Sequence, residues 1–177
     1  MPGGQSRKML LVKVGLFSVV CLGFSLMVHG NHMVDTSTSH YGIWEYCLES
    51  ASSCTEIDTV MHNRQQREIN AARFFLLASH LVCLALLLVV SLAIFGVGMK
   101  KKVANIILVT LSTISFLFLL IGMSLATNVV SETLDDTTSS KVDWSFVMPW
   151  IGAGFGFLQF VEIIMVAMLG TKDLEEF

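Results

Sequence analysis

Charged side chains are scarce in this chain: Asp, Glu, Lys and Arg make up only 14% of its 177 residues. A water-soluble domain of this size needs a larger polar surface, so the scarcity excludes the soluble globular classes. Hydrophobic residues account for 54% of the chain, and the mean hydropathy is +0.70. The composition therefore predicts an integral membrane protein.

The sequence also lacks the motifs of common enzyme classes. It contains no G-x-S-x-G, no H-E-x-x-H and no Gly-rich phosphate loop. A net charge of −3 provides no basic surface for nucleic acid. The five histidines are scattered, and we expect His80, inside an apolar run, to make a hydrogen bond within a helix bundle. We therefore predict a protein that is not an enzyme, with no cofactor and no nucleic-acid partner.

The four cysteines fall into two environments. Cys21 and Cys83 lie in apolar runs and are expected to be small buried hydrophobes. Cys47 and Cys54 lie together in a polar stretch, and they would form a disulfide if that stretch is outside the cell, where thiols oxidise. A zinc site that combines this second pair with nearby histidines is the alternative, although the spacing fits no common zinc pattern.

Four apolar runs have the roughly 20 residues that a helix needs to cross a bilayer. They cover about residues 9–28, 72–98, 103–127 and 145–169. The expected fold is a single domain over residues 1–177, an all-α membrane bundle of four transmembrane helices. Two polar loops, about residues 31–71 and 128–144, join these helices on one side of the membrane.

Lys and Arg are concentrated on the other side of these predicted spans. Arg7, Lys8 and Lys13 lie near the start of the first span, residues 100–102 are three lysines between the second and third, and Lys172 follows the fourth. The positive-inside rule places that side in the cytoplasm. We therefore expect a multi-pass plasma-membrane protein with cytoplasmic N- and C-termini and two extracellular loops, in which acidic residues outnumber basic ones.

The first extracellular loop contains two stretches of alternating side chains. Residues 41–48 alternate along the chain, and residues 55–60 carry β-branched side chains at alternate positions. The pattern predicts a short antiparallel hairpin stapled between Cys47 and Cys54. A hairpin alone is marginally stable, so further strands or contact with the membrane are expected to support it.

The same loop carries a motif, Gly42-Ile43-Trp44-Glu45-Tyr46-Cys47 followed by Cys54, and Arg73 follows small residues at the outer start of the second span. In these features the chain resembles the claudin superfamily, which includes the peripheral myelin protein, the epithelial membrane proteins, the lens fibre membrane intrinsic protein and the calcium-channel gamma subunits. That family has G-L-W-x-x-C and a later Cys in its first outer loop. It usually has a further Trp soon after the first helix, where this chain has His-Gly-Asn-His-Met at residues 29–33.

The resemblance implies a four-helix bundle topped by a small extracellular antiparallel β-sheet. It implies a role in cell–cell adhesion, junction formation and membrane organisation, through contacts of the outer loops with other copies. The gamma subunits leave a second role open, that of an auxiliary subunit of an ion channel or another membrane protein. A junction protein should concentrate at contacts between two expressing cells, whereas a channel subunit should co-purify with a larger partner.

Trp44 and Arg73 have expected structural roles. Trp44 should lie near the membrane surface, where an indole buries its ring and keeps its N–H in water. The resemblance implies that this ring packs the sheet onto the outer ends of the helices. Arg73, at the outer boundary of the second span, is expected to hydrogen-bond carbonyl groups of the first loop.

Glu162 lies inside the fourth span, about 10 Å from its cytoplasmic end at about 1.5 Å per residue. A charge near mid-membrane costs about 2.5–3.5 kcal/mol, so this side chain is expected to face protein. Ser91 in the second span and Thr110 in the third lie at a similar depth. We therefore predict a polar cluster of Glu162 with one or both hydroxyls, as a structural hydrogen bond between helices; ion handling is the alternative.

Two further features concern packing and partners. Gly152 and Gly156 form a G-x-x-x-G step, which permits close helix contact within the bundle or between protomers. The C-terminal Phe177 follows two glutamates and could bind weakly to a PDZ-type groove by strand addition, although a frayed tail is the simpler interpretation. The expected partners are the lipid bilayer and either further copies of the chain or another membrane protein.

Overall fold

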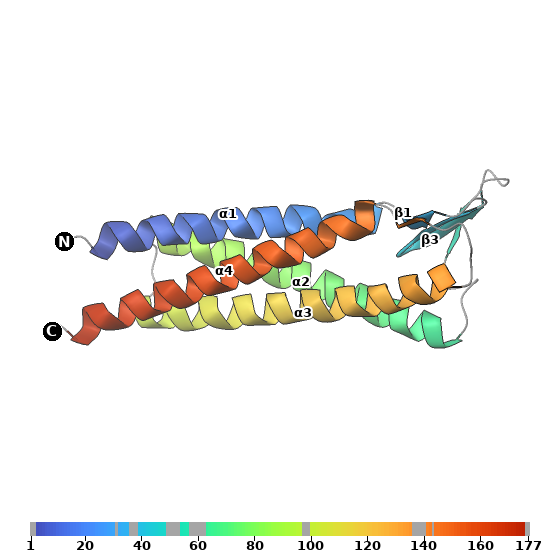
Figure 1. Ribbon diagram of the computed structural model, residues 1–177. Coiled ribbons are helices and arrows are strands. Elements are labelled where there is room, and N and C mark those ends of the chain that lie inside the picture. Colours follow the sequence, from blue (N-terminus) through green and yellow to red (C-terminus); the bar gives the residue numbers. More distant parts are fainter. Residues whose placement is uncertain are drawn as a thin grey trace.

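The computed structural model describes residues 3–30, 32–35, 39–48, 54–56, 63–96, 100–135, 141–142 and 144–175. Four long helices form an elongated bundle, and a small β-sheet caps one end of it (Figure 1). The first helix begins, and the last helix ends, at the opposite end (Figure 1). We call these the sheet end and the terminal end of the bundle. The predicted fold class, a four-helix membrane bundle with a small antiparallel sheet, is confirmed.

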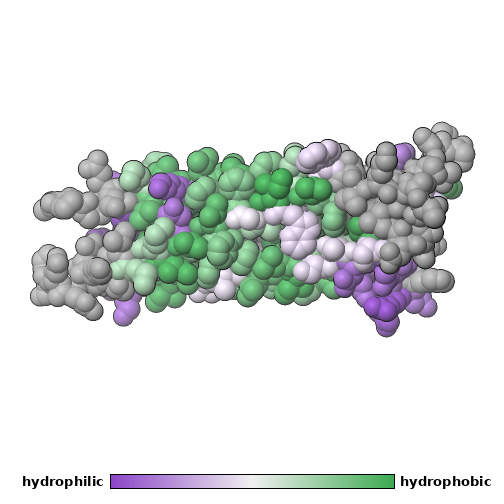
Figure 2. Space-filling view, viewed as in Figure 1, coloured by the Kyte–Doolittle hydropathy of each residue, from purple (hydrophilic) through white to green (hydrophobic). Residues whose placement is uncertain are grey.

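The helices are α1 (Gly3–Gly30), α2 (Asn63–Phe95), α3 (Lys101–Asp135) and α4 (Trp144–Glu175). Each contains an apolar stretch long enough to cross a membrane. Exposed hydrophobic side chains form an apolar belt along the face shown in Figure 2. Such a surface is stable only in lipid, so the chain is a multi-pass membrane protein.

Helices α2 and α3 continue past the predicted spans at the sheet end. Helix α2 begins at Asn63 rather than near residue 72, and α3 ends at Asp135 rather than near residue 127. Polar contacts support the first extension, because Arg64 Nε donates to Glu68 Oε1 one turn along the helix, at 3.2 Å. An apolar window detects only the part of a helix that lies in lipid. The predicted loops 31–71 and 128–144 are therefore longer than those in the structure.

The connection between α2 and α3 is short. Helix α2 ends at Phe95, and Gly96 follows with a φ of 73°. This left-handed conformation ends a helix at little cost only in glycine, which has no Cβ. The next helix begins at Lys101, so α2 and α3 pack side by side along the bundle.

Two apolar clusters fill the interior of the bundle. The cluster toward the sheet end includes Leu76, Leu119 and Met123, all of them almost fully buried. The cluster toward the terminal end includes Leu11, Leu86 and Leu108. Side chains of this kind stabilise the fold by contact with one another and by exclusion of polar groups from the interior.

Gly152 and Gly156 of α4 lie directly against α1. A Cβ on Gly152 would lie 3.1 Å from the carbonyl oxygen of Cys21, and one on Gly156 would lie 3.3 Å from Cys21 Sγ. The G-x-x-x-G step therefore makes a close contact inside the bundle. A Cβ on Gly154, which lies between the two, would have no neighbouring heavy atom of the described residues within 4 Å.

A Gly152→Leu substitution is expected to destabilise the bundle by about 1–3 kcal/mol, because the new side chain must displace backbone atoms of α1. Gly154→Leu is the matched control on the same helix, and its side chain enters open space. Thermal unfolding of both variants in detergent micelles measures the difference. Equal unfolding temperatures for the two variants would contradict the packing described here.

The sheet contains five short strands: β1 (His32–Asp35), β2 (Ser39–Gly42), β3 (Glu45–Leu48), β4 (Cys54–Glu56) and β5 (Lys141–Val142). Their order is β4-β3-β2-β1-β5, and each neighbouring pair is antiparallel. The predicted hairpin corresponds to β3 and β4, but its expected first strand, residues 41–48, is divided between β2 and β3 by a bend at Ile43 and Trp44. Residues 57–60 of its expected second strand lie outside the described residues. Strand β5 comes from the second loop, so the sheet joins both connections at this end.

Candidate functional site

The hairpin at the edge of the sheet is closed by a disulfide. Cys47 and Cys54 are opposite each other in the register of β3 and β4, with Cα atoms 4.2 Å apart, and their sulfurs are bonded. The predicted disulfide is therefore present. Glu45 is close to both sulfurs, but cysteines that are bonded to each other offer no thiolate to a metal. Among the described residues, this group is not a zinc site.

Ile43 attaches the sheet to the helices. It lies between β2 and β3, and its side chain is only 1% exposed because it enters the apolar cluster at the sheet end of the bundle. Its carbonyl oxygen accepts a hydrogen bond of 2.8 Å from Arg73 Nε. Ile43 thus holds the sheet on the helices in two ways, by its buried side chain and by its backbone carbonyl.

Arg73 projects from α2 beneath the sheet. Its side chain also donates from Nη1 to Asn70 Oδ1 at 2.7 Å, and its guanidinium carbon lies 4.6 Å from the centre of the Trp44 ring. A guanidinium makes several directed hydrogen bonds and stacks on an aromatic face at the same time. Arg73, only 9% exposed, therefore links α2 to the loop backbone, as expected from its boundary position.

Trp44 connects the sheet to α1. Its Nε1–H donates to His29 Nδ1 at 3.0 Å, and the two rings are 5.9 Å apart. The indole remains 37% exposed, so one part of the ring packs on protein and the other part faces outward. This placement fits the predicted role of Trp44 at the junction of sheet and helices.

Two histidines extend this contact into the bundle. His29 Nε2 lies 3.3 Å from His80 Nδ1, and His80 Nε2 lies 2.8 Å from Ser25 Oγ. Ser25 Oγ in turn donates to the carbonyl oxygen of Leu22 at 3.1 Å. The expected bundle hydrogen bond of His80 is therefore present, and it joins α1 to α2.

The partners fix the tautomers of both imidazoles. An indole N–H only donates, so His29 Nδ1 must accept from Trp44 and the proton of a neutral His29 lies on Nε2. That proton is donated to His80 Nδ1, so the proton of His80 lies on Nε2 and is donated to Ser25. Each N–H or O–H group in the series from Trp44 to Ser25 then donates to one acceptor. We call this series of four residues the histidine chain.

A His80→Leu substitution is expected to destabilise the sheet end by about 1–3 kcal/mol, because it leaves His29 Nε2–H without an acceptor and Ser25 Oγ without the donor His80. Ser91→Ala is the control on the same helix, since Ser91 is exposed and its hydroxyl donates to the carbonyl of Leu87 within its own helix. Thermal unfolding in detergent compares the two. A His80→Leu protein as stable as the control would show that the histidine chain contributes nothing.

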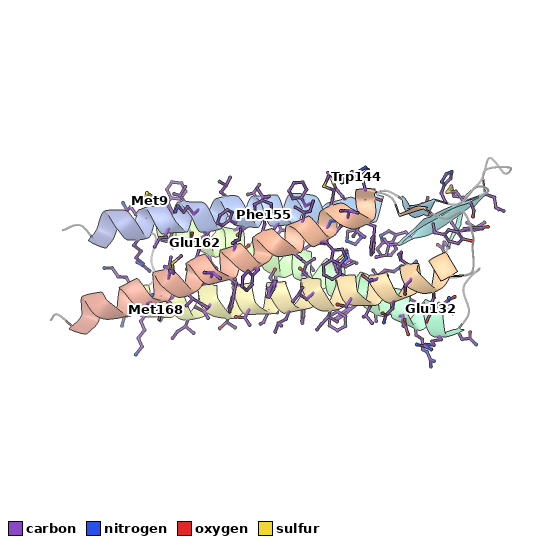
Figure 3. All side chains as sticks on the ribbon, in the orientation of Figure 1. Met9, Glu132, Trp144, Phe155, Glu162 and Met168 are labelled. Atoms are coloured by element: carbon purple, nitrogen blue, oxygen red, sulfur yellow. A yellow bond between two sulfur atoms is a disulfide. The ribbon has the colours of Figure 1, made fainter. Side chains whose placement is uncertain are left out.

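The outer ends of α2 and α3 form a second polar surface. Glu132 of α3 lies at the sheet end (Figure 3), where its Oε2 accepts from Gln65 Nε2 at 3.2 Å. Arg64 Nη2 lies 3.7 Å from Glu132 Oε1. Figure 2 shows a strongly hydrophilic patch at this end of the molecule, in contrast to the apolar belt. Such a surface belongs in water rather than in lipid.

Strand β4 forms one edge of the sheet, and all three of its residues are exposed. On the neighbouring strand β3, Leu48 is 41% exposed. Strand edges can pair with strands of another molecule, and exposed apolar side chains can add buried area to such a contact. An exposed strand edge and an exposed apolar side chain therefore lie together on the hairpin that the disulfide closes.

The structure does not bring together the predicted cluster of Glu162, Ser91 and Thr110. The Ser91 hydroxyl donates to the carbonyl of Leu87 in its own helix at 2.8 Å, and Thr110 is exposed on α3. Equal depth in the membrane was the basis of that prediction, but depth does not determine which face of a helix a residue occupies. Glu162 is partly buried, and its Oε2 has no hydrogen-bond partner among the described residues.

His29, Ser25 and Asn70 were not predicted to be site residues from the sequence. A signal for His29 was present, because this histidine occupies the segment where the resembled family usually has a tryptophan. The predicted PDZ contact at Phe177 lies outside the described residues.

The chain matches a known protein family. A family model described as the PMP-22/EMP/MP20/Claudin family matches residues 6–161. That region contains all five strands and the whole of α2 and α3. A search of curated proteins finds no match.

Proposed function

The chain belongs to the PMP-22/EMP/MP20/claudin family, and on this premise we propose that it is a plasma-membrane adhesion protein whose sheet end contacts other copies across or along the cell surface. The observation that carries the proposal is the edge of the sheet. Strand β4 and the side chain of Leu48 are exposed there, on a hairpin closed by a disulfide. A rigid contact surface loses little conformational freedom when it binds.

The proposed orientation places the sheet end outside the cell. Lys100 directly precedes α3 and Lys101 and Lys102 begin it, all at the terminal end, and the positive-inside rule assigns that end to the cytoplasm. The disulfide supports the same orientation, because disulfides persist in an oxidising compartment. Both termini would then be cytoplasmic, and the hydrophilic sheet end would face neighbouring cells.

Imaging of cell contacts tests the proposal. A tagged copy is expressed in cells that lack junctions, and contacts between two expressing cells are compared with contacts to a non-expressing neighbour. We expect enrichment only at the paired contacts, and we expect Leu48→Lys to abolish it, because the charge enters an exposed apolar part of the sheet. Arg67→Ala, at an exposed position on α2, is the control and should leave the enrichment unchanged.

A uniform surface signal for the wild-type chain would overturn the adhesion proposal. The same cells would then be used to ask whether the chain co-purifies with a larger membrane protein, as an auxiliary channel subunit should. Retained enrichment of the Leu48→Lys protein would show that adhesion does not use this face of the sheet.

A further inference from the structure

Two ionisable residues lie within the apolar spans of neighbouring helices. Lys13 is in α1 and Glu162 is in α4, each inside a stretch that is long and apolar enough to cross a membrane. Lys13 is exposed, and Glu162 is partly exposed. Ionised groups are unfavourable against hydrocarbon, so such residues usually mark a contact with another protein group.

Helix packing places the two residues at the same depth. Helices α1 and α4 run in opposite directions, and Cys21 contacts both Gly152 and Gly156. From that contact Lys13 lies about 12 Å toward the terminal end along α1, at about 1.5 Å per residue. By the same rise, Glu162 lies about 9–15 Å toward that end along α4. The two charges are therefore level with each other in the membrane.

The two residues also lie beside the same seam. Phe17 of α1 and Phe155 of α4 pack together across this seam, with ring centres 6.1 Å apart. Lys13 is one turn before Phe17, and Glu162 is two turns after Phe155, so each flanks the seam. Figure 3 shows Phe155 and Glu162 on the side of α4 that faces α1. Figure 2 shows a hydrophilic patch that interrupts the apolar belt between these two helices.

Neither charge has a partner of opposite sign within the described part of the chain. The ion pairs found there involve Arg64 with Glu68 and Glu132, at the sheet end. Glu162 Oε2 is covered by the chain itself and has no hydrogen-bond partner in that same part, so a second copy can reach only the exposed remainder of this side chain. The seam thus carries one acidic and one basic group that are level with each other and unpaired.

We propose that the α1–α4 seam is a contact between two copies of this chain in the same membrane, with Lys13 of each copy facing Glu162 of the other. A two-fold axis along the membrane normal places each residue at the same depth in both copies. Because Lys13 and Glu162 share one depth, Lys13 of each copy can then face Glu162 of the other. The contact is then made twice. Apolar side chains at seven-residue intervals on the same side of α4 would complete it: Ile151, Leu158 and Met165, all exposed in the single chain.

This contact lies within the membrane and is separate from the proposed adhesion surface of the sheet. It can therefore be measured in one membrane, where no facing cell is present. The assay is energy transfer between two differently labelled copies in lipid vesicles, at a high lipid-to-protein ratio.

The decisive variants are Lys13→Glu and Glu162→Lys. Alone, each should associate with itself about tenfold more weakly than the wild type does, because like charges face each other; tenfold corresponds to about 1.4 kcal/mol. A mixture of the two variants should associate like the wild type. The Lys13→Glu copy has acidic residues at both positions, and they then face the two basic residues of the Glu162→Lys copy. Lys8→Glu, an exposed reversal five residues earlier on α1, is the control and should associate normally.

Two outcomes would overturn the proposal. If the mixture fails to associate while the double variant Lys13→Glu, Glu162→Lys behaves normally, the two residues pair within one copy and not between copies. If all variants associate as the wild type does, or if the wild type does not associate, the seam is not a contact between copies. Thermal unfolding of each variant in detergent shows whether it is folded before the comparison is made.

Discussion

Arg73→Leu is expected to separate the sheet from the helices and to cause the largest loss of stability among the single substitutions proposed for this chain. The guanidinium donates to the carbonyl of Ile43 and to Asn70, and it stacks against Trp44. Removal leaves a carbonyl group without its donor in a site where Arg73 itself is only 9% exposed. Loss of hydrogen bonds from a charged donor, each worth about 1.5–3 kcal/mol, predicts a total cost of about 3 kcal/mol or more.

The measurement is the fraction of protein that reaches the cell surface, together with thermal unfolding in detergent. Arg73→Lys should be intermediate, because an ammonium keeps the charge but cannot donate in the fork geometry of a guanidinium. Arg67→Leu on the same helix is the matched control, since Arg67 is exposed. Similar surface levels for the Arg73→Leu and Arg67→Leu proteins would contradict the role assigned to Arg73.

Loss of the disulfide in a Cys47→Ser, Cys54→Ser protein is expected to abolish contact enrichment between cells while the bundle remains folded. Closure of so short a loop stabilises the hairpin by about 2–3 kcal/mol. Strands of three or four residues form few other stabilising contacts, so the hairpin depends on this bond. The helices keep their own apolar clusters. We therefore expect normal membrane insertion, a lower unfolding temperature and loss of adhesion.

A membrane-impermeant reductant on intact cells should reproduce this result in the wild-type chain. Cys54 is exposed, so the reductant reaches the bond if the sheet end is outside the cell. Cys21 and Cys83 are free and buried, so they contribute no second disulfide. If the reductant acts only after the cells are permeabilised, the proposed orientation is wrong.

Much of the fold was predictable because hydrophobicity is a local property of the sequence. Four runs of apolar residues predicted four helices, and the lysines at residues 100–102 marked a short connection between two of them. The pairing of Cys47 with Cys54 also followed from position, since both cysteines lie in one short polar stretch. The motif around Trp44 added the sheet by resemblance.

The parts that sequence reasoning missed depend on how the helices and loops face each other. Strand β5 has two residues, too few to show an alternating pattern, and its partner β1 lies far away in the chain. The histidine chain requires α1 and α2 to bring His29 and His80 together, which no spacing within one helix reveals. For the same reason, depth alone placed Ser91 beside Glu162, although the hydroxyl bonds to its own helix.

The most direct test of the adhesion account is vesicle clustering by the purified chain alone. The protein is reconstituted into lipid vesicles, and light scattering reports whether the vesicles cluster relative to empty ones. We predict clustering by the wild-type chain, and its loss in the Cys47→Ser, Cys54→Ser protein and after reduction. Vesicles that carry the folded wild-type chain and stay as dispersed as empty ones would contradict the account.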